Sequence, residues 1–467
     1  MKDTKRIFTL FSFYDRTGIE KFLEKQARNG WLLVKMSAFG WKFQRIEPQE
    51  IHFSVTYFPS ASAFDPEPSE DQQVFREFCE HTGWRLAASG AQMQIFFNTE
   101  AEPVPIETEA LLELENIHAA AKKSYLPTYV MQLCLGILQL VMLGIRLNTD
   151  SIGFMANNAN LFAGVCWVLV LVICCGELVQ YYSWLKKARS AAETDGSFVD
   201  TRSTVNFQLI SVLVFLAALA FMLLSFGDPR MGYVAIFTVA GILVITAVIV
   251  GMTELMKRLK VNAGMNMSVT ILLAVVLSIV FTGVLVFGII QAVMSDREED
   301  IPYATYEYKG HTYDVYHHDI PLTIEDLMDT GYDGYSYIRL RDEESVFLSR
   351  LEATQRPRYD ALEQPDFSYT VVDVKWNALY GACLKDMLDD YDGWSSEDIY
   401  GNVFHDSFIL ADAAPWGADQ VYQLKQGGVD EMSQCYILCY GDRLVKIRFD
   451  WDVTAEQMAK IGAVLGK

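Results

Sequence analysis

The pattern of apolar positions divides the chain into three blocks. Between Leu126 and Met294 the apolar runs are long and almost free of charge, whereas residues 1–125 and 295–467 mix apolar and polar positions as water-soluble domains do. A helix needs about 20 apolar residues to cross a bilayer, because every backbone N–H and C=O must be paired within the segment. The pattern therefore predicts a membrane protein in which block 126–294 spans the lipid bilayer and the flanking blocks are folded domains.

Five stretches of the middle block are long and apolar enough to span a bilayer, and short polar segments separate them. The stretches are Tyr129–Leu147, Leu161–Trp184, Val205–Phe226, Gly232–Met256 and Ser268–Met294. We therefore expect a bundle of about five transmembrane helices.

Lysine and arginine are distributed unevenly over the segments that connect these stretches. Basic clusters precede the first span and separate the second from the third and the fourth from the fifth, whereas the other two connections hold only Arg146 and Arg230. The clustered cations are Lys122, Lys123, Lys186, Lys187, Arg189, Arg202, Lys257, Arg258 and Lys260. Because cytoplasmic loops carry the excess of Lys and Arg, this distribution predicts a multi-pass cell-membrane protein with a cytoplasmic N-terminus. An odd number of spans then places the C-terminal block on the extracytoplasmic side.

The first block alternates helix-like and strand-like patterns. One amphipathic helix is expected to begin at Asp15 and to end at Gly30, and a second to cover residues 70–81. The apolar positions on one side of the second helix are Val74, Phe75 and Phe78. The expected strands are Ile7–Phe13, Trp31–Ser37, Trp41–Ile46, Ile51–Phe58, Trp84–Ala88 and Met93–Asn98.

An internal repeat is visible in this block. The order helix, Gly-Trp, strand, turn, strand occurs first at Gly30-Trp31 and again at Gly83-Trp84. Both glycines can end a helix in the left-handed conformation, and both tryptophans can pack against the helix that precedes them. The repeat predicts a ferredoxin-like α+β domain, with helices on one face of an antiparallel sheet. We expect the tryptophans to be core residues, with ligand stacking as the alternative.

The first quarter of the chain also carries a signature. It consists of Phe13-Tyr14-Asp15, Gly18-Ile19-Glu20-Lys21-Phe22-Leu23-Glu24, Ala27 and Gly30-Trp31-Leu32. This signature resembles that of an uncharacterised family of bacterial membrane proteins, in which an N-terminal domain of unknown function is often followed by several membrane spans. The resemblance implies a cytoplasmic domain that tends to accompany PadR-type transcriptional regulators. It supplies no catalytic residues.

The last block has the pattern of a second α+β domain of about 170 residues, which is large enough for its own core. The expected strands are a pair within Tyr306–Tyr316, the stretches Tyr337–Leu351 and Phe367–Trp376, and a hairpin formed by Cys435–Tyr440 and Leu444–Trp451. The expected helices are Pro321–Met328, Asn377–Leu388 and Ala455–Leu465.

Nearly all the excess negative charge lies in this last block. Residues 295–467 hold 15 Lys and Arg against 34 Asp and Glu, a net charge of −19 out of −21 for the chain. Such a surface repels nucleic acid and anionic lipid headgroups, so nucleic acid is excluded as a partner, whereas a cationic ligand or calcium is favoured. The structural alternative is that the charge only keeps the domain soluble beside the membrane.

Two groups of residues in the last block are candidates for metal binding. His311, His317 and His318 occur with Asp314 and Asp319, but their spacing suits the edge of a strand better than a metal site. The acidic run is Asp386, Asp389, Asp390, Asp392, Glu397 and Asp398, and it departs from the EF-hand because Leu388 and Ile399 stand where carboxylates belong. The chain has no nucleophile, phosphate-loop or zinc-protease motif in a suitable context, so we predict no catalytic, cofactor-binding or metal residues and expect that the protein is not an enzyme.

Two carboxylates and three cysteines complete the list of candidates. Glu177 and Glu254 lie within or beside apolar stretches, near Lys186 and Lys257 respectively, and we expect structural pairing or snorkelling, with an ion relay as the alternative. A disulfide between Cys383 and either Cys435 or Cys439 stays open, whereas Cys435 and Cys439 are too far apart on one strand to pair with each other.

Two folded domains on opposite sides of a membrane favour a sensor or regulatory protein, because a ligand on one side can bias a contact on the other. Such a protein would have a cytoplasmic partner for residues 1–125. The alternative is a small-molecule transporter or a transporter accessory subunit, although the spans show no clear duplication and few central polar groups. An extracytoplasmic enzyme is a third class, which spacing alone does not test.

Overall fold

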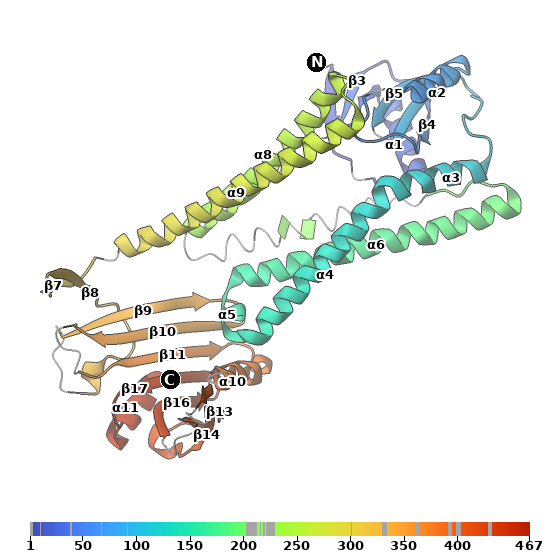
Figure 1. Ribbon diagram of the computed structural model, residues 1–467. Helices are drawn as coiled ribbons and strands as arrows, with labels where there is room; N and C mark the ends of the chain where they lie inside the picture. The colour runs from blue at the N-terminus through green and yellow to red at the C-terminus, as the bar shows by residue number, and fades with distance from the viewer. Residues whose placement is uncertain are drawn as a thin grey trace. The chain divides into compact units, whose positions relative to one another are not determined.

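The computed structural model of the chain is shown in Figure 1. It describes residues 3–9, 11–37, 40–66, 68–90, 92–201, 213–214, 216–217, 220, 229–299, 301–328, 334–359, 364–390, 395–397, 403–427 and 432–467. The chain forms two compact units. The first contains Met1–Gln139, Val165–Leu223 and Asp228–Ile289, and the second contains Leu140–Gly164, Leu224–Gly227 and Ile290–Lys467.

The N-terminal part of the first unit is a tandem repeat of a strand–helix–strand–strand motif. The first copy is β1 (Thr4–Ile7), α1 (Arg16–Arg28), β2 (Trp31–Lys35) and β3 (Trp41–Arg45). The second is β4 (His52–Tyr57), α2 (Glu70–His81), β5 (Arg85–Gly90) and β6 (Met93–Asn98). The strand orders, β1-β3-β2 and β4-β6-β5, are equivalent, and all pairs are antiparallel. The expected single ferredoxin-like sheet is therefore replaced by two three-stranded sheets, one for each copy.

The helix boundaries follow from local chemistry in both copies. Asp15 caps α1 by accepting a hydrogen bond from the Gly18 N–H, and Ser69 forms a capping box with Gln72 at the start of α2. Each helix is followed by a left-handed glycine, Gly30 with φ 81° and Gly83 with φ 85°. The expected helices are confirmed, whereas the first strand lies earlier than expected, over Thr4–Ile7.

The two tryptophans differ in burial, and so do the apolar residues of α2. Trp84 is buried in a small core with Cys79 and Phe96, as expected, whereas Trp31 is only half-buried and lies under the Lys5 ammonium. Helix α2 is found over the expected residues, and two of the apolar residues on its side are exposed, Val74 by 64% and Phe78 by 57%. The buried residues of this helix are Gln72 and Cys79.

Four helices among the described residues are long and apolar enough to cross a membrane, so the chain is a multi-pass membrane protein. They include α4 (Leu126–Thr149), which continues α3 (Ala110–Ala120) through the π-helical turn Ala121–Tyr125, and α6 (Asn158–Asp195), α8 (Pro229–Arg258) and α9 (Ala263–Glu299). About five spans were expected, and four are found in the described part of the chain. The expected span Val205–Phe226 falls almost entirely outside the described residues. The short helix α5 (Ser151–Ala156) connects α4 to α6.

The C-terminal part of the second unit is built on a seven-stranded antiparallel sheet with the order β14-β15-β16-β17-β11-β10-β9. Its strands are β9 (Tyr335–Glu344), β10 (Leu348–Pro357), β11 (Phe367–Val374), β14 (Ser407–Ala411), β15 (Gln420–Lys425), β16 (Met432–Tyr440) and β17 (Arg443–Phe449). Helix α11 (Ala455–Leu465) packs on one face of the sheet, and α10 (Tyr380–Asp389) packs with α5 on the other. The remaining strands are the hairpin β7 (Ala304–Tyr308) and β8 (His311–Val315), and the pair β12 (Ser395–Glu397) and β13 (Val403–His405).

The C-terminal expectations are confirmed for the hairpins and for both long helices. Two were wrong in detail, because the stretch Tyr337–Leu351 contains the turn between β9 and β10, and Pro321–Met328 forms only a 3₁₀ turn at Ile324–Asp326. Strands β12 to β15 were not expected. None of the eight cysteines, all of which lie in the described part of the chain, forms a disulfide, so the pairing of Cys383 with Cys435 or Cys439 is not found.

Candidate functional site

Helix α5, at the turn between two membrane helices, is built into the C-terminal sheet of the second unit. The Asp386 carboxylate on α10 accepts hydrogen bonds from the backbone N–H groups of Ser151 and Ile152, each at 2.9 Å. These are orphan donors of the first turn of a helix, so the carboxylate satisfies them and complements the helix dipole. The α5 side chains Ile152, Phe154, Met155 and Ala156 are buried in one core with strands β10, β11, β16 and β17. The turn of the membrane hairpin is thus part of a folded domain.

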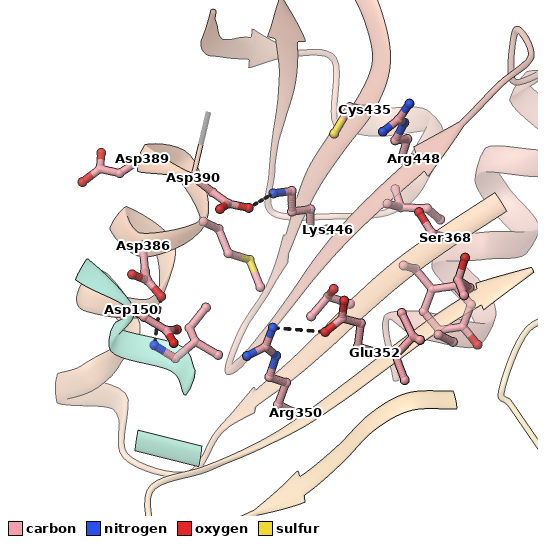
Figure 2. A pocket seen from close by; sticks show the side chains of 18 of the residues that line it. Asp150, Arg350, Glu352, Ser368, Asp386, Asp389, Asp390, Cys435, Lys446 and Arg448 are labelled. Atoms are coloured by element: carbon pink, nitrogen blue, oxygen red, sulfur yellow. Dashed lines mark hydrogen bonds and ion pairs between the residues drawn. The ribbon is translucent and has the colours of Figure 1, made fainter. Parts of the chain in front are cut away.

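A cavity of about 610 Å³ lies beside this junction, within the second unit. Its lining comes from the end of α4 and the start of α5, from α10, and from the face of the sheet formed by β10, β11, β16 and β17. Figure 2 shows Asp150 and Asp386 at one end, and Arg448 beside Ser368 and Cys435 at the other. The volume is in the range of small-molecule sites.

The strand register arranges the side chains on this face of the sheet in rows that cross the strands. The first row contains Arg350, Val372, Leu444 and Cys439, and the second contains Glu352, Thr370, Lys446 and Ile437. The third contains Thr354, Ser368, Arg448 and Cys435. The first row is largely apolar and belongs to the core beneath α5 and α10, whereas the third carries two hydroxyls and a guanidinium. The face therefore changes from apolar to polar and cationic along the strands.

Most charged groups in the cavity are already paired. Arg350 contacts Glu352 at 3.2 Å, and Lys446 forms an ion pair with Asp390, as the dashed lines of Figure 2 show. Asp389 lies 3.9 Å from Lys385. Within the described part of the chain, the side chains of Arg356 and Arg448 form no hydrogen bond or ion pair. Both are exposed, and both interact electrostatically with Asp366. They lower the pKa of the Asp366 carboxyl, whereas burial and Asp450 raise it.

The acidic run and the histidines take structural roles where the structure describes them. Asp386 caps α5 and Asp390 binds Lys446, while Asp392 and Asp398 lie outside the described residues. The ring of His317 stacks on Tyr303 and Tyr337, and His318 accepts a hydrogen bond from the Arg339 N–H at 3.0 Å. Among the residues that the structure describes, no three His, Cys, Asp or Glu side chains gather closely enough to hold a metal ion.

The other end of the same helical hairpin is built into the first unit through Glu177. This residue of α6 is fully buried, and its carboxylate accepts hydrogen bonds from the Ser12 hydroxyl at 2.7 Å and the Tyr125 hydroxyl at 3.1 Å. Burying a carboxylate is costly unless hydrogen-bond donors stabilise it, and these donors come from two other segments of the chain. The structural pairing expected of Glu177 is found, but with Ser12 and Tyr125. Glu254 lies 3.5 Å from Lys257, in agreement with the expected pair.

Aromatic rings surround this carboxylate. The buried Tyr14 packs against Tyr181 and Trp184 of α6, with ring centroids 5.2 Å and 5.1 Å apart, and against Tyr125 at 6.2 Å. Burial and the negative charge of Glu177 raise the pKa of the Tyr14 hydroxyl, which keeps it neutral. The aromatic cluster excludes water from the contact between the segment before α1 and the membrane helices.

The segment that follows α6 returns to the start of α1. The Thr201 hydroxyl donates to Asp15 at 2.7 Å, and the Thr201 N–H donates to the Thr17 hydroxyl at 2.8 Å. Burial raises the pKa of Asp15, and the bonds from Thr201 and Gly18 lower it. Lys21 forms an exposed ion pair with Asp200 at 2.7 Å. The first turn of α1 is therefore held by residues that lie more than 180 positions later in the chain.

Residues 15–128 match the family described as "Protein of unknown function (DUF2812)". The matched segment, called the DUF2812 domain below, covers about a quarter of the chain. A search of curated proteins finds no match to the chain. The predicted resemblance to an uncharacterised family is thereby confirmed, while the association with PadR-type regulators stays an expectation.

The DUF2812 match begins at Asp15 and reaches into the first membrane helix. Its boundaries therefore include α1 and the π-helical turn with Tyr125, and they begin immediately after Tyr14. The signature residues Tyr14 and Asp15 contact α6 and the segment after it, so the signature marks a docking surface for a membrane helix. Sequence reasoning used them only as a family signature and missed Ser12. The one available clue was an acidic residue, Glu177, in an apolar stretch.

A charged cluster within the DUF2812 domain joins α1 to α3. Arg16 lies between Glu20, at 3.6 Å, and Glu113, to which it donates a hydrogen bond. Glu20 also accepts from the Val55 N–H at 2.9 Å. Burial raises the pKa of Glu20 to about 7 against the lowering effect of Arg16, and burial together with Glu113 raises the pKa of Glu107 to about 7.

Proposed function

We propose that this chain is a non-enzymatic sensor or regulatory membrane protein that couples an extracytoplasmic domain to a cytoplasmic DUF2812 domain. One observation carries the proposal: the helical hairpin of α4 and α6 is anchored at both ends. At one end Glu177 accepts hydrogen bonds from Ser12 and Tyr125, and at the other Asp386 accepts hydrogen bonds from the backbone of Ser151 and Ile152. A ligand that changes one anchor can act on the other through a continuous element of the chain, and α4 runs without interruption over Leu126–Thr149 between the two anchors.

The same two anchors support the proposed topology. Helix α4 has 24 residues, and at 1.5 Å per residue it extends about 36 Å, which exceeds the hydrocarbon thickness of about 30 Å. The anchor at Tyr125 precedes this helix and the anchor at Ser151 follows it, so a membrane-spanning α4 separates them by a bilayer. Together with the basic residues beside Tyr125, Lys122 and Lys123, this favours a cytoplasmic DUF2812 domain and an extracytoplasmic C-terminal domain.

Protease accessibility tests this topology. Protease added to intact cells is expected to remove residues of the C-terminal domain and to leave residues 1–125 uncut. Cleavage of residues 1–125 with protection of the C-terminal domain would reverse the topology and remove the basis for the coupling.

The partner surface that we propose on the DUF2812 domain is the exposed side of α2. Val74 and Phe78 are large apolar residues that lie more than half exposed on one helix, four positions apart, and therefore on one face. Exposed apolar pairs of this kind are typical of protein contacts when they lie on a rigid element. A cytoplasmic regulator is the kind of partner that the family resemblance implies. Crosslinking from position 81, which is exposed on the same helix, is expected to capture a specific protein in cells, and Phe78→Asp should prevent that capture, with Glu77→Asp as the control.

Coupling itself is tested by hydrogen–deuterium exchange of the full chain in lipid nanodiscs. Asp386→Ala removes the cap on α5, and we expect faster exchange not only in residues 151–156 but also at residues 12–24 and 177–201. Asp389→Ala is the matched control, because Asp389 lies on the same helix and contacts only Lys385, at 3.9 Å, among the described residues. If the Asp386→Ala effect stays within the second unit, the hairpin does not transmit it and the proposal fails.

A further inference from the structure

The fold does not explain why several cationic side chains of the C-terminal sheet line one cavity, because the block that contains them has a strongly negative net charge. Residues 295–467 carry a net charge of −19, yet Arg350, Arg356, Lys446 and Arg448 all line one cavity. Cations gathered on one face of an acidic domain need a reason beyond solubility. The net negative charge of the whole block favours a cationic ligand, whereas the cations that line this cavity favour an anionic one.

The acidic residues that line the cavity are paired, whereas the two outermost arginines, Arg356 and Arg448, have only an electrostatic interaction with Asp366 among the described residues. Asp386 accepts from two backbone N–H groups, Asp150 accepts from the Gly153 N–H at 2.8 Å, and Asp390 binds Lys446. Within the described residues, Arg356 and Arg448 have no side-chain hydrogen bond or ion pair. An oxyanion is the group that matches a guanidinium in both charge and geometry, because it accepts two parallel hydrogen bonds.

Hydroxyl groups lie next to these arginines in the strand register. Ser368 on β11 pairs directly with Arg448 on β17, and Thr354 on β10 pairs with Ser368. Side chains of directly opposed residues in antiparallel strands lie within about 5.5 Å of each other at Cβ, so the two hydroxyls and the guanidinium form one short row. Such a row can supply three or more donors to a single bound anion.

We propose that this cavity binds a small soluble ligand through a carboxylate or phosphate group held by Arg356, Arg448, Ser368 and Thr354. The rest of the ligand would extend toward Ile152 and Met387, which line the same cavity from the helical side. A ligand in this position contacts both the sheet and the start of α5, the segment that Asp386 anchors. The inference therefore deepens the proposed function, because it names the class of signal and the place where it would act on the hairpin.

Direct binding to the purified full chain in detergent tests the proposal, with inorganic phosphate and citrate as the probes in isothermal titration calorimetry. We expect at least one probe to bind, and the double variant Arg356→Gln/Arg448→Gln to bind it at least tenfold more weakly. The control Lys385→Gln/Lys460→Gln removes the same charge from exposed lysines that do not line the cavity, and its affinity should change less than twofold. Both arginines are exposed, so the double variant should keep the wild-type melting temperature. Arg448→Lys serves as a milder variant that keeps the charge but loses the planar fork, and it should weaken binding at least threefold.

Three outcomes would overturn the proposal. They are a wild-type chain that binds neither probe, an affinity that the arginine variants leave unchanged, and arginine-dependent binding seen only with phosphatidylglycerol nanodiscs and not with the soluble anions. None of these measurements reports on the DUF2812 domain. A chain that binds the anion but shows no effect at residues 12–24 would therefore retain the ligand site and lose the proposed coupling.

Discussion

Ser12 donates a hydrogen bond of 2.7 Å to the buried carboxylate of Glu177, 165 residues further along the chain. The donor precedes the first helix of the DUF2812 domain, and the acceptor lies in a membrane helix. The bond therefore holds the segment before α1 to the membrane helix α6.

Ser12→Ala should weaken this contact. A hydrogen bond to a charged group contributes about 1.5–3 kcal/mol, and its loss leaves the Glu177 carboxylate with one donor fewer in a buried site. We expect the free energy of unfolding of the first unit to fall by about 2 kcal/mol, measured by tryptophan fluorescence in denaturant, since Trp184 lies in this contact. Ser54→Ala in β4 is the control and should change it by about 0.5 kcal/mol or less. An equal effect of the two variants would show that the bond is not a stabilising one.

Thr201→Val removes the hydroxyl that donates to Asp15 but keeps the shape of the side chain. We expect the segment after α6 to detach from α1, so limited proteolysis near residue 200 should become several-fold faster in detergent. Thr194→Val is the control, because among the described residues the Thr194 hydroxyl bonds only to the Ser190 carbonyl of its own helix. Unchanged cleavage in Thr201→Val would mean that Asp200 or the backbone bond to Thr17 holds the segment without it.

The contact between α1 and α3 should depend on pH. The folded-state pKa values of Glu20 and Glu107 are raised to about 7 from the ordinary value of 4.5, so the folded state binds more protons than the unfolded state between these values. Stability should therefore fall as the pH rises from about 5 to 7, by at most about 1.4 kcal/mol per pH unit for each carboxyl, and level off above pH 7.

Melting temperatures of the full chain between pH 5 and 8 measure this dependence. Glu20→Gln and Glu107→Gln should each flatten the curve, because the amide does not titrate. Glu115→Gln on α3 is the control and should leave the curve unchanged, because Glu115 is exposed. A wild-type curve that rises over this range would contradict the expected sign.

Helices α8 and α9 approach closely at Gly241, where a Cβ atom would collide with the ring of Phe281. Gly241→Ala should force that ring aside and lower stability by about 1–3 kcal/mol. Gly251→Ala on the same helix meets no atom within 4 Å and should be neutral or slightly stabilising. Thermal unfolding in detergent measures both, and equal melting temperatures for the two variants would argue against the close packing.

The sequence was most informative where a local rule decides the structure. The lengths of the apolar runs predicted α4, α6, α8 and α9, and Gly30 and Gly83 predicted where α1 and α2 end, since only the chain near each residue matters there. The helical spacing places Val74 and Phe78 on one side of α2 but does not show that this side is exposed, and Cys79 is the residue of α2 that lies in the small core with Trp84 and Phe96. Periodicity identifies a face but not what covers it.

The candidate site was beyond sequence reasoning for a different reason. The row of Thr354, Ser368 and Arg448 exists only through the register of three strands, and the residues lie up to 94 positions apart. The net charge of the block favoured a cationic ligand because it counts every carboxylate, whether paired or not. In the fold, Asp386 accepts a hydrogen bond from the start of α5, and Asp390 forms an ion pair with Lys446. Which charges are occupied is a property of the fold.

The two strand–helix–strand–strand copies give the N-terminal domain two equivalent helices, α1 and α2, which make different contacts. The first copy presents its helix start to Thr201 and the aromatic rings of α6, while the second leaves Phe78 facing solvent. Duplication thus gives one helix that is attached to the rest of the chain and one whose apolar side is open to solvent. Contacts within the chain constrain the sequence of the first copy at its helix start, and they leave the exposed side of α2 without such a constraint.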